Sequence, residues 1–210
     1  MDKRTRAEKV IEILEQVYPD AVCCLTYNEP YQLMIAARLS AQCTDARVNT
    51  VTPALFERFP TIKSFADADT QDIEDIIKSC GLYKTKALSI KQMCSVLWYE
   101  LDGVLPDTVE ELVKLPGIGR KTANLLVGDV FGKPAIVCDT HCIRISGRLG
   151  FTKSKDPAIV EKDLKIILPP DKSSDLCHRF VLFGRDTCTA RKPDCEHCPI
   201  RANVLCEAII

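Results

Sequence analysis

Four cysteines near the end of the chain restrict how its last segment can fold. Cys188, Cys195, Cys198 and Cys206 are separated by spacers of six, two and seven residues. The short spacer lets Cys195 and Cys198 face one centre, and the loop before them brings Cys188 back to it. Four thiolates suit either a tetrahedral zinc ion or an iron–sulfur cluster, and the spacing leaves both open. We therefore expect residues 188–206 to form a loop around a metal centre.

The rest of the composition is that of an ordinary folded protein. The chain has 210 residues, 46% hydrophobic and 27% charged, and the eight cysteines outside the loop are scattered among helical patterns. Such cysteines are typical of small buried side chains in a reducing compartment. No stretch is apolar enough to span a membrane, and Met1-Asp2-Lys3-Arg4 precedes an amphipathic pattern, not a signal peptide. We expect a monomer in the cytoplasm, associated with the nucleoid if the source is bacterial.

The charge is unevenly distributed. The net charge of −1 gives no support for nucleic-acid binding, but residues 108–153 hold seven Lys/Arg against four acids. A basic face of this kind suits contact with phosphate, although a solvated helix surface would explain the same charges.

Apolar residues recur at the spacing of one helix face along nearly the whole chain. Val10, Ile13, Leu14 and Val17 predict a first helix that ends before Pro19. Further helices are predicted at 30–39, 44–55, 73–80, 87–97, 156–167 and 173–183. Period-two alternation is confined to a short run at 135–137. The pattern predicts an all-α protein.

A glycine turn joins two short helices in the middle of the chain. Thr108–Glu111 has the pattern of a capping box and predicts a helix that ends near Leu115. After Pro116-Gly117-Ile118-Gly119, a second helix is predicted from about Arg120 to Phe131. Its first N–H groups lack partners within the helix and would suit a phosphate oxygen. A lone G-x-G would fit any helix–turn–helix corner equally well, but the whole string is more specific.

Several ordered motifs together resemble one protein family. Leu115–Asn124 (LPGIGRKTAN) is similar to the helix-hairpin-helix of the endonuclease III family of DNA glycosylases, and Val137–His141 follows where that family has its catalytic aspartate. Ser40–Asp45 and Gly81–Tyr83 resemble two further family segments. The cysteine loop, including Ala190–Pro193, resembles the family's 4Fe-4S cluster loop. The resemblance covers almost the whole chain.

The resemblance implies two helical lobes with DNA in the cleft between them. Residues 1–22 would be an N-terminal helix packed on the C-terminal lobe. Residues 23–133 would form the helical domain that contains the helix-hairpin-helix at about 108–131. Residues 134–210 would form the C-terminal lobe with its cluster loop at 188–206.

The resemblance also implies two catalytic residues. The amine of Lys121 would attack C1′ of the damaged nucleotide, displace the base and leave a Schiff base that permits β-elimination of the 3′ phosphate. The attack requires an uncharged amine, which the neighbouring Arg120 would favour. Asp139 would stabilise cationic character at the sugar and help to move protons. Without the family, Lys121 would be interpreted as a phosphate contact and Asp139 as a helix cap.

Removing a base from a duplex requires its nucleotide to be rotated out of the stack, at a cost of roughly a few kcal/mol. By resemblance, Gln42 hydrogen-bonds the orphaned base and Leu82 provides an apolar wedge. Taken alone, they would be a surface amide and a loop leucine. Further DNA contacts are expected from the hairpin and the cluster loop: Gly117, Ile118, Gly119, Arg120, Arg191 and Lys192.

The cluster loop differs from the family's pattern in its last spacer, which usually has five residues and here has seven. Cys206 is the expected fourth ligand, since it is the only cysteine after Cys198. If it does not bind, Cys177 or a non-cysteine group would complete the site. The three histidines, His141, His178 and His197, are assigned no chemistry.

The implied function is that of a bifunctional DNA glycosylase/AP lyase of base excision repair with a 4Fe-4S cluster. Its partner would be double-stranded DNA that contains oxidised pyrimidines or abasic sites. One alternative is a monofunctional adenine-mismatch glycosylase of the same fold, against which Lys121 argues. Another is a non-enzymatic helix-hairpin-helix protein with structural zinc, which would need neither Lys121 nor Asp139.

Overall fold

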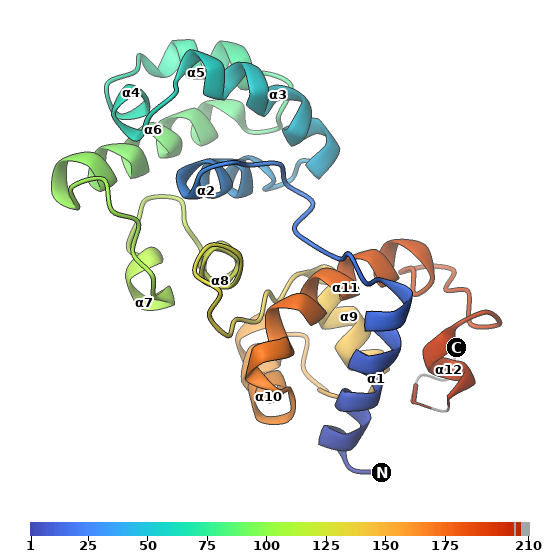
Figure 1. The fold of residues 1–210 in the computed structure, drawn as a ribbon. Helices are drawn as coiled ribbons and strands as arrows, with labels where there is room; N and C mark the ends of the chain where they lie inside the picture. The colour runs from blue at the N-terminus through green and yellow to red at the C-terminus, as the bar shows by residue number, and fades with distance from the viewer. Residues whose placement is uncertain (204, 207–210) are drawn as a thin grey trace. The chain divides into compact units, whose positions relative to one another are not determined.

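The computed structural model describes residues 1–203, 205 and 206, and these residues are helical with no β-strand among them (Figure 1). The prediction of an all-α protein is confirmed. The chain divides into two compact units: unit 1, with residues 1–23 and 132–210, and unit 2, with residues 24–131. Residues 204 and 207–210 of the predicted C-terminal lobe lie outside the described residues. The predicted arrangement of two lobes around DNA stays a prediction.

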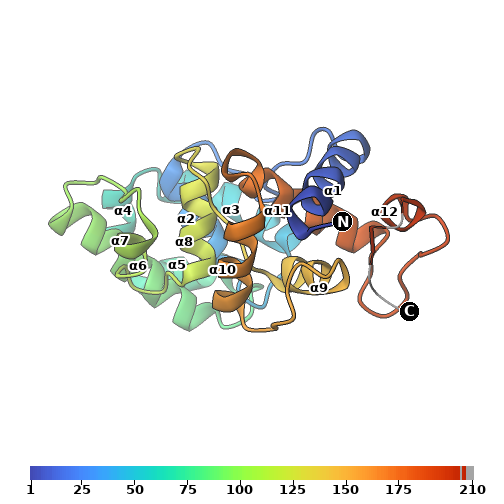
Figure 2. The same ribbon diagram turned by 90° about the horizontal axis from the view of Figure 1, so that it is seen from below.

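Unit 2 is built around its longest helix. Its elements are α2 (Pro30–Leu39), α3 (Asp45–Arg58), α4 (Ile62–Ala66), α5 (Thr70–Ile77), α6 (Tyr83–Glu100), α7 (Val109–Leu112) and α8 (Arg120–Asp129). The central helix α6 packs against α2, α4 and α5, while α8 lies beside α2 (Figure 2). Leu33, Phe65, Ile90 and Leu97 are fully buried in this core.

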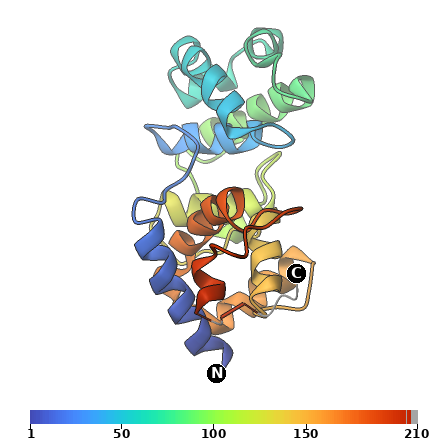
Figure 3. The same cartoon turned by 90° about the vertical axis from the view of Figure 1, so that its right-hand side faces the viewer.

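Unit 1 joins the two ends of the chain. Its elements are α1 (Lys3–Val17), α9 (Thr140–Arg148), α10 (Pro157–Ile167), a 3-10 turn (Pro170–Lys172), α11 (Ser173–Asp186) and α12 (Pro199–Ala202). Helix α1 packs against α10, α11 and α12 (Figure 3). The hydroxyl of Tyr18, at the end of α1, donates to Asp186 Oδ2 at 2.9 Å. Burial raises the pKa of Tyr18 to about 12. The first helix thus anchors the end of α11, from which the cysteine loop begins.

Local sequence signals account for where most helices start. The side chains of Thr44 and Asp156 accept hydrogen bonds from the first turns of α3 and α10, at the residues where the predicted helices 44–55 and 156–167 begin. Pro30 occupies the first position of α2, where a missing N–H costs nothing. Among the described helices, none is long and apolar enough to cross a membrane.

Two predicted helix signals were wrong. Thr108 makes no side-chain capping bond, and α7 ends at Leu112 rather than near Leu115, so the predicted capping box is absent. The helix predicted at 173–183 does not end before Gly184, as the position of that glycine would suggest, but continues as α11 to Asp186. The glycine serves packing instead, because a Cβ there would lie 2.6 Å from Arg144 Nη2 and 2.7 Å from a ring carbon of His141. Close contact between α9 and α11 therefore requires this glycine.

Candidate active site and metal centre

The glycine turn between α7 and α8 packs onto two other helices of unit 2. Gly117 has a φ of +80°, and a Cβ on it would lie 2.9 Å from both Arg38 Nε and Ser89 Cβ. Leu115 and Ile118 are buried on either side of it. Only glycine satisfies both the backbone conformation and the close approach. The turn is thereby held against α2 and α6.

The start of α8 has the features of an anion-binding site. Gly119 is its N-cap and has no side chain that could accept from the first N–H groups. A Cβ at Gly119 would meet no atom within 4 Å, so the backbone is open to an approaching group. Arg120 and Lys121 follow, and both are exposed. The helix dipole and the two cations therefore favour a phosphate at this position. The four hairpin residues that were predicted to contact DNA, Gly117 to Arg120, all lie in this turn.

Asp139 caps α9 in unit 1. Its Oδ1 accepts hydrogen bonds from the N–H groups of His141 at 2.9 Å and Cys142 at 2.8 Å. Its Oδ2 lies 3.0 Å from His141 Nδ1. The capping interpretation is confirmed, and His141 is a structural partner of the carboxylate. These bonds orient the side chain, whose catalytic role stays a prediction.

Gln42 and Leu82 lie on neighbouring loops of unit 2 and share an unusual backbone conformation. Both are non-glycine residues with positive φ, 53° and 58°. Both are exposed, and Leu82 keeps 58% of its surface accessible. The loops are adjacent, since a Cβ on Gly81 would lie 3.4 Å from Gln42 O. Left-handed φ costs a non-glycine residue about 1–2 kcal/mol, and such strain concentrates at functional sites.

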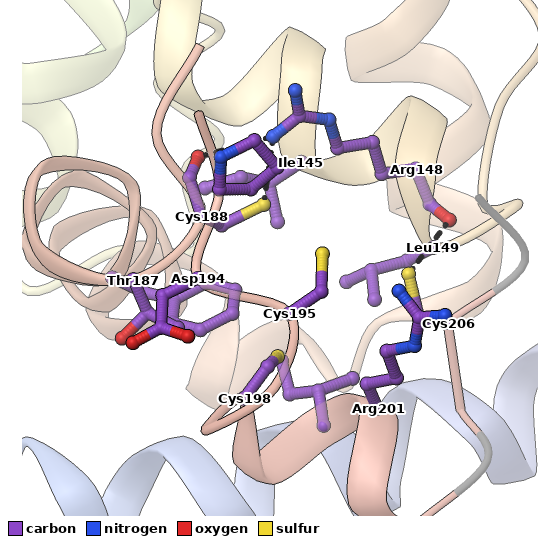
Figure 4. Close-up of a pocket in the computed structure, with 13 residues that line it drawn as sticks. Ile145, Arg148, Leu149, Thr187, Cys188, Asp194, Cys195, Cys198, Arg201 and Cys206 are labelled. Atoms are coloured by element: carbon purple, nitrogen blue, oxygen red, sulfur yellow. Dashed lines mark hydrogen bonds between the residues drawn. The ribbon is translucent and has the colours of Figure 1, made fainter. Parts of the chain in front are cut away.

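The four cysteines of the C-terminal loop line a single cavity in unit 1. Figure 4 shows their sulfur atoms around a common space, with Cys188 on the segment that follows α11 and Cys198 at the start of α12. Cys206 lies in this cavity despite the long spacer before it. The apolar side chains that line the cavity are Ile145, Leu149, Phe183, Pro193 and Ile200. Thiols in apolar surroundings are the donor set of an iron–sulfur cluster.

The other possible ligands lie elsewhere. The Sγ of Cys177 accepts from Val137 N and donates to Ser173 O, both at 3.3 Å, away from the cavity. The ring of His197 pairs with Asp194 at 2.9 Å. Within the described part of the chain, no three His, Cys, Asp or Glu side chains are placed to hold a single metal ion. The cysteines thus surround a shared space without converging on one point.

Two arginines that the sequence analysis did not single out hold the loop. Arg148 Nη1 donates to Cys188 O at 3.2 Å, to Cys188 Sγ at 3.1 Å and to Thr189 O at 2.8 Å. Its Nη2 donates to Ala190 O at 3.1 Å. Arg144 Nη2 also reaches Cys188 O, at 3.2 Å. The i, i+4 spacing of the two arginines could be seen in the sequence. Nothing in the sequence indicated that the carbonyl groups of the cysteine loop would accept their hydrogen bonds.

The loop presents the two basic residues that were predicted to contact DNA. Arg191 and Lys192 are exposed between the first two cysteines. Thr189 Oγ1 donates to Lys192 O at 2.6 Å, and Asp194 N donates to Thr187 O at 2.9 Å. These bonds close the loop on itself and leave both cations facing solvent.

Comparison with known proteins decides the family. The profile of the HhH-GPD superfamily of base excision DNA repair proteins matches residues 35–170, and that of the iron-sulfur binding domain of endonuclease III matches residues 188–203. Endonuclease III of Synechocystis sp. (strain ATCC 27184 / PCC 6803 / Kazusa) is 44% identical over 199 residues, which cover 94% of this chain and 91% of the relative. The chain belongs to the endonuclease III family of base excision DNA repair proteins.

Other relatives agree. Endonuclease III of Escherichia coli (strain K12) is 37% identical over 207 residues, 99% of this chain and 97% of the relative. A structure of a trapped endonuclease III–DNA covalent intermediate matches with a TM-score of 0.91 and 41% identity, covering 99% of this chain and 97% of that one. A thermostable thymine-DNA glycosylase, 21% identical with a TM-score of 0.85, shares the fold.

Membership of the endonuclease III family has two consequences. The chain is a DNA glycosylase with AP lyase activity. It carries a 4Fe-4S cluster, which fits the four thiols of the cavity and its apolar walls. The match to the cluster domain ends at residue 203 and does not include Cys206. The assignment of Cys206 as a ligand therefore rests on its position in the cavity.

Proposed function

We propose that this chain binds duplex DNA, removes oxidised pyrimidines from it and then cleaves the abasic strand by β-elimination, with Lys121 as the nucleophile. The observation that carries the proposal is the position of Lys121. It is exposed in the first turn of α8, beside a helix start without a side-chain cap. A phosphate bound by this turn would hold the damaged strand next to the amine.

The proposed reaction begins with the uncharged amine of Lys121. Its nitrogen forms a bond to C1′ as the glycosidic bond breaks, and the base leaves with a proton. The C1′–O4′ bond of the resulting aminal then breaks as O4′ takes up a proton, which opens the sugar ring and leaves a protonated imine between Lys121 and C1′. This imine acidifies the C2′ protons. Loss of one of these protons expels the 3′ phosphate, and water then releases the cleaved sugar from the lysine.

Asp139 would stabilise the positive charge that develops on the sugar. Its carboxylate is fixed by two backbone N–H groups and by His141, so little reorganisation is needed during the reaction. An oriented anion stabilises a cationic sugar and can take up or return a proton. The same side chain would thus act as both helix cap and catalytic group.

Gln42 and Leu82 would fill the space that the extruded nucleotide leaves. Exposure and strained backbone at both positions support this role. The amide of Gln42 can pair with the orphaned base, and the Leu82 side chain can take the place of the lost stacking.

Cys188, Cys195, Cys198 and Cys206 would hold the cluster. When bound, it ties both ends of the loop together and so stabilises the local fold. Arg191 and Lys192 would then contact the DNA backbone from an ordered loop.

Borohydride trapping tests the nucleophile, because hydride reduces the imine to a stable amine. Abasic duplex incubated with the wild-type protein should give a covalent adduct, and Lys121→Ala should give none. Lys114→Ala removes another exposed lysine of the same unit and should trap normally. Full trapping by Lys121→Ala would exclude Lys121 as the nucleophile.

A lesion panel tests the substrate class. Duplexes with an oxidised pyrimidine, an oxidised purine or a mispaired adenine are assayed for base release and strand scission. We expect release followed by scission with the oxidised pyrimidine. Preferred release of mispaired adenine without scission would support the monofunctional alternative.

A further inference from the structure

Lys86 is a charged residue that none of the roles above uses. It lies in α6 and is fully buried, with 0% of its surface accessible. Its Nζ donates to the carbonyl oxygen of Leu39 at 2.8 Å, and its backbone N–H donates to Leu82 O at 3.0 Å. Leu39 is the last residue of α2, just before the loop that carries Gln42. Lys86 therefore contacts the start of the loop that carries Gln42 and the end of the loop that carries Leu82. We call these two loops the wedge loops.

The bond to Leu39 O satisfies a helix end. The last carbonyl groups of a helix have no partner within it, and they form the negative end of the helix dipole. A buried ammonium group at this position therefore meets both a hydrogen-bond acceptor and a favourable field. The bond fixes where α2 ends and where its following loop begins.

Among the described residues, the groups that act on the pKa of Lys86 are two thiols and a guanidinium, and none of them is a carboxylate. Burial lowers the pKa of Lys86, and the guanidinium of Arg38 lowers it further, while the thiols of Cys43 and Cys80 act in the opposite direction. Burying a charge costs free energy unless it is well hydrogen-bonded. The hydrogen bond from Lys86 Nζ to Leu39 O offsets part of this cost.

The same segment of α6 also reaches the glycine turn. Ser89 Oγ donates to Lys86 O at 3.0 Å and accepts from Arg38 Nε at 2.7 Å. Gly117 packs on this Arg38–Ser89 pair. One turn of α6 thus supports the two wedge loops and the turn that would hold phosphate.

We infer that Lys86 is a positioning residue that holds the Gln42 and Leu82 loops at the spacing needed to replace an extruded nucleotide. The inference rests on the wedge roles given under the proposed function. Strained backbone persists only where the surrounding structure holds it. Lys86 provides that support at both loops, through its side chain at one and its backbone at the other.

The test compares two substrates that differ in the need for extrusion. One has an oxidised pyrimidine paired in a duplex, and the other has it in an unpaired bulge between duplex arms. Lys86→Met keeps the length of the side chain but removes its donor. We expect the single-turnover rate of base release to fall about tenfold on the paired substrate and less than twofold on the bulge.

Met93→Ala is the matched control for stability. Met93 lies seven residues further along α6, two helical turns away on the same face, and is also fully buried. The Met93→Ala substitution should lower the melting temperature but leave unchanged the ratio of the base-release rate on the paired substrate to that on the bulge. If Lys86→Met does not fold, Lys86→Gln replaces it, since the shorter amide reaches Leu39 O poorly and should lower the ratio too.

Gln42→Ala and Leu82→Ala separate the possible failures. Both should lower the same ratio. If both keep the wild-type ratio, the wedge assignment fails and this inference fails with it. If both lower the ratio but a folded Lys86 variant keeps it, or if Met93→Ala lowers it equally, the role of Lys86 alone is overturned.

Discussion

Arg148 Nη1 lies 3.1 Å from the sulfur of Cys188 and 3.2 Å from its carbonyl oxygen. Arg148 is the last residue of α9, and Asp139 caps the first turn of the same helix. Helix α9 therefore links the predicted catalytic carboxylate at one end to the cluster loop at the other. Both ends depend on hydrogen bonds that a single substitution can remove.

Replacing Arg148 should weaken the cluster site. Arg148→Met removes the donors to Cys188, Thr189 and Ala190, and leaves their acceptors without this partner. Loss of such supporting bonds typically costs about 10- to 100-fold in metal affinity. We expect iron to be lost to a chelator faster by about that factor. Lys162→Met, which removes an exposed cation from the same unit, should lose iron at the wild-type rate. Equal rates in both variants would contradict the role of Arg148.

Substitutions of Asp139 should separate its two roles. Asparagine caps helices as well as aspartate, so Asp139→Asn should change the free energy of unfolding by less than about 0.5 kcal/mol. Its rate of base release should fall about 10²- to 10⁴-fold if the carboxylate acts on protons at the sugar. Asp139→Ala should lose the same activity and about 1 kcal/mol of stability. Rates are measured by single turnover, stability by denaturant unfolding and affinity by titration with duplex. A near-normal rate in Asp139→Asn would rule out the catalytic role.

Gly117→Ala should destabilise unit 2. The new methyl group would enter space held by Arg38 and Ser89, at a φ that alanine avoids. Together these effects should lower the free energy of unfolding by about 2–4 kcal/mol. Gly119→Ala meets no neighbour and should cost less than about 1 kcal/mol. Thermal and urea unfolding of the two variants give the comparison, and similar losses in both would show that the turn does not require glycine at 117.

Removing Cys206 tests the fourth ligand. Cys206→Ala should lower the iron bound per chain and its visible absorbance, because an open coordination position exposes the cluster. Cys177→Ser keeps a hydrogen-bonding side chain at a buried site outside the cavity and should retain the wild-type iron content. Full iron in Cys206→Ala, measured together with acid-labile sulfide, would show that another group completes the site.

The all-α class, most of the longer helices, some of the helix starts and the family could be predicted from the sequence. These properties depend on signals within a few residues, such as Thr44 before α3, Asp156 before α10 or the LPGIGRKTAN string. At the end of α11, where the prediction failed, a tertiary contact lies at the position of the local signal. Gly184 has the pattern of a helix stop, yet α11 continues through it because α9 packs closely against that glycine.

Only the tertiary structure decided which distant groups meet. Arg148 reaches Cys188 across 40 positions of sequence, and Lys86 reaches Leu39 across 47. Except for the Cys188 sulfur, the acceptors are backbone carbonyls, which every residue has, so no residue type marks them in advance. Capping and periodicity are short-range and can be predicted from the chain, whereas these bonds exist only once packing has brought the helices together.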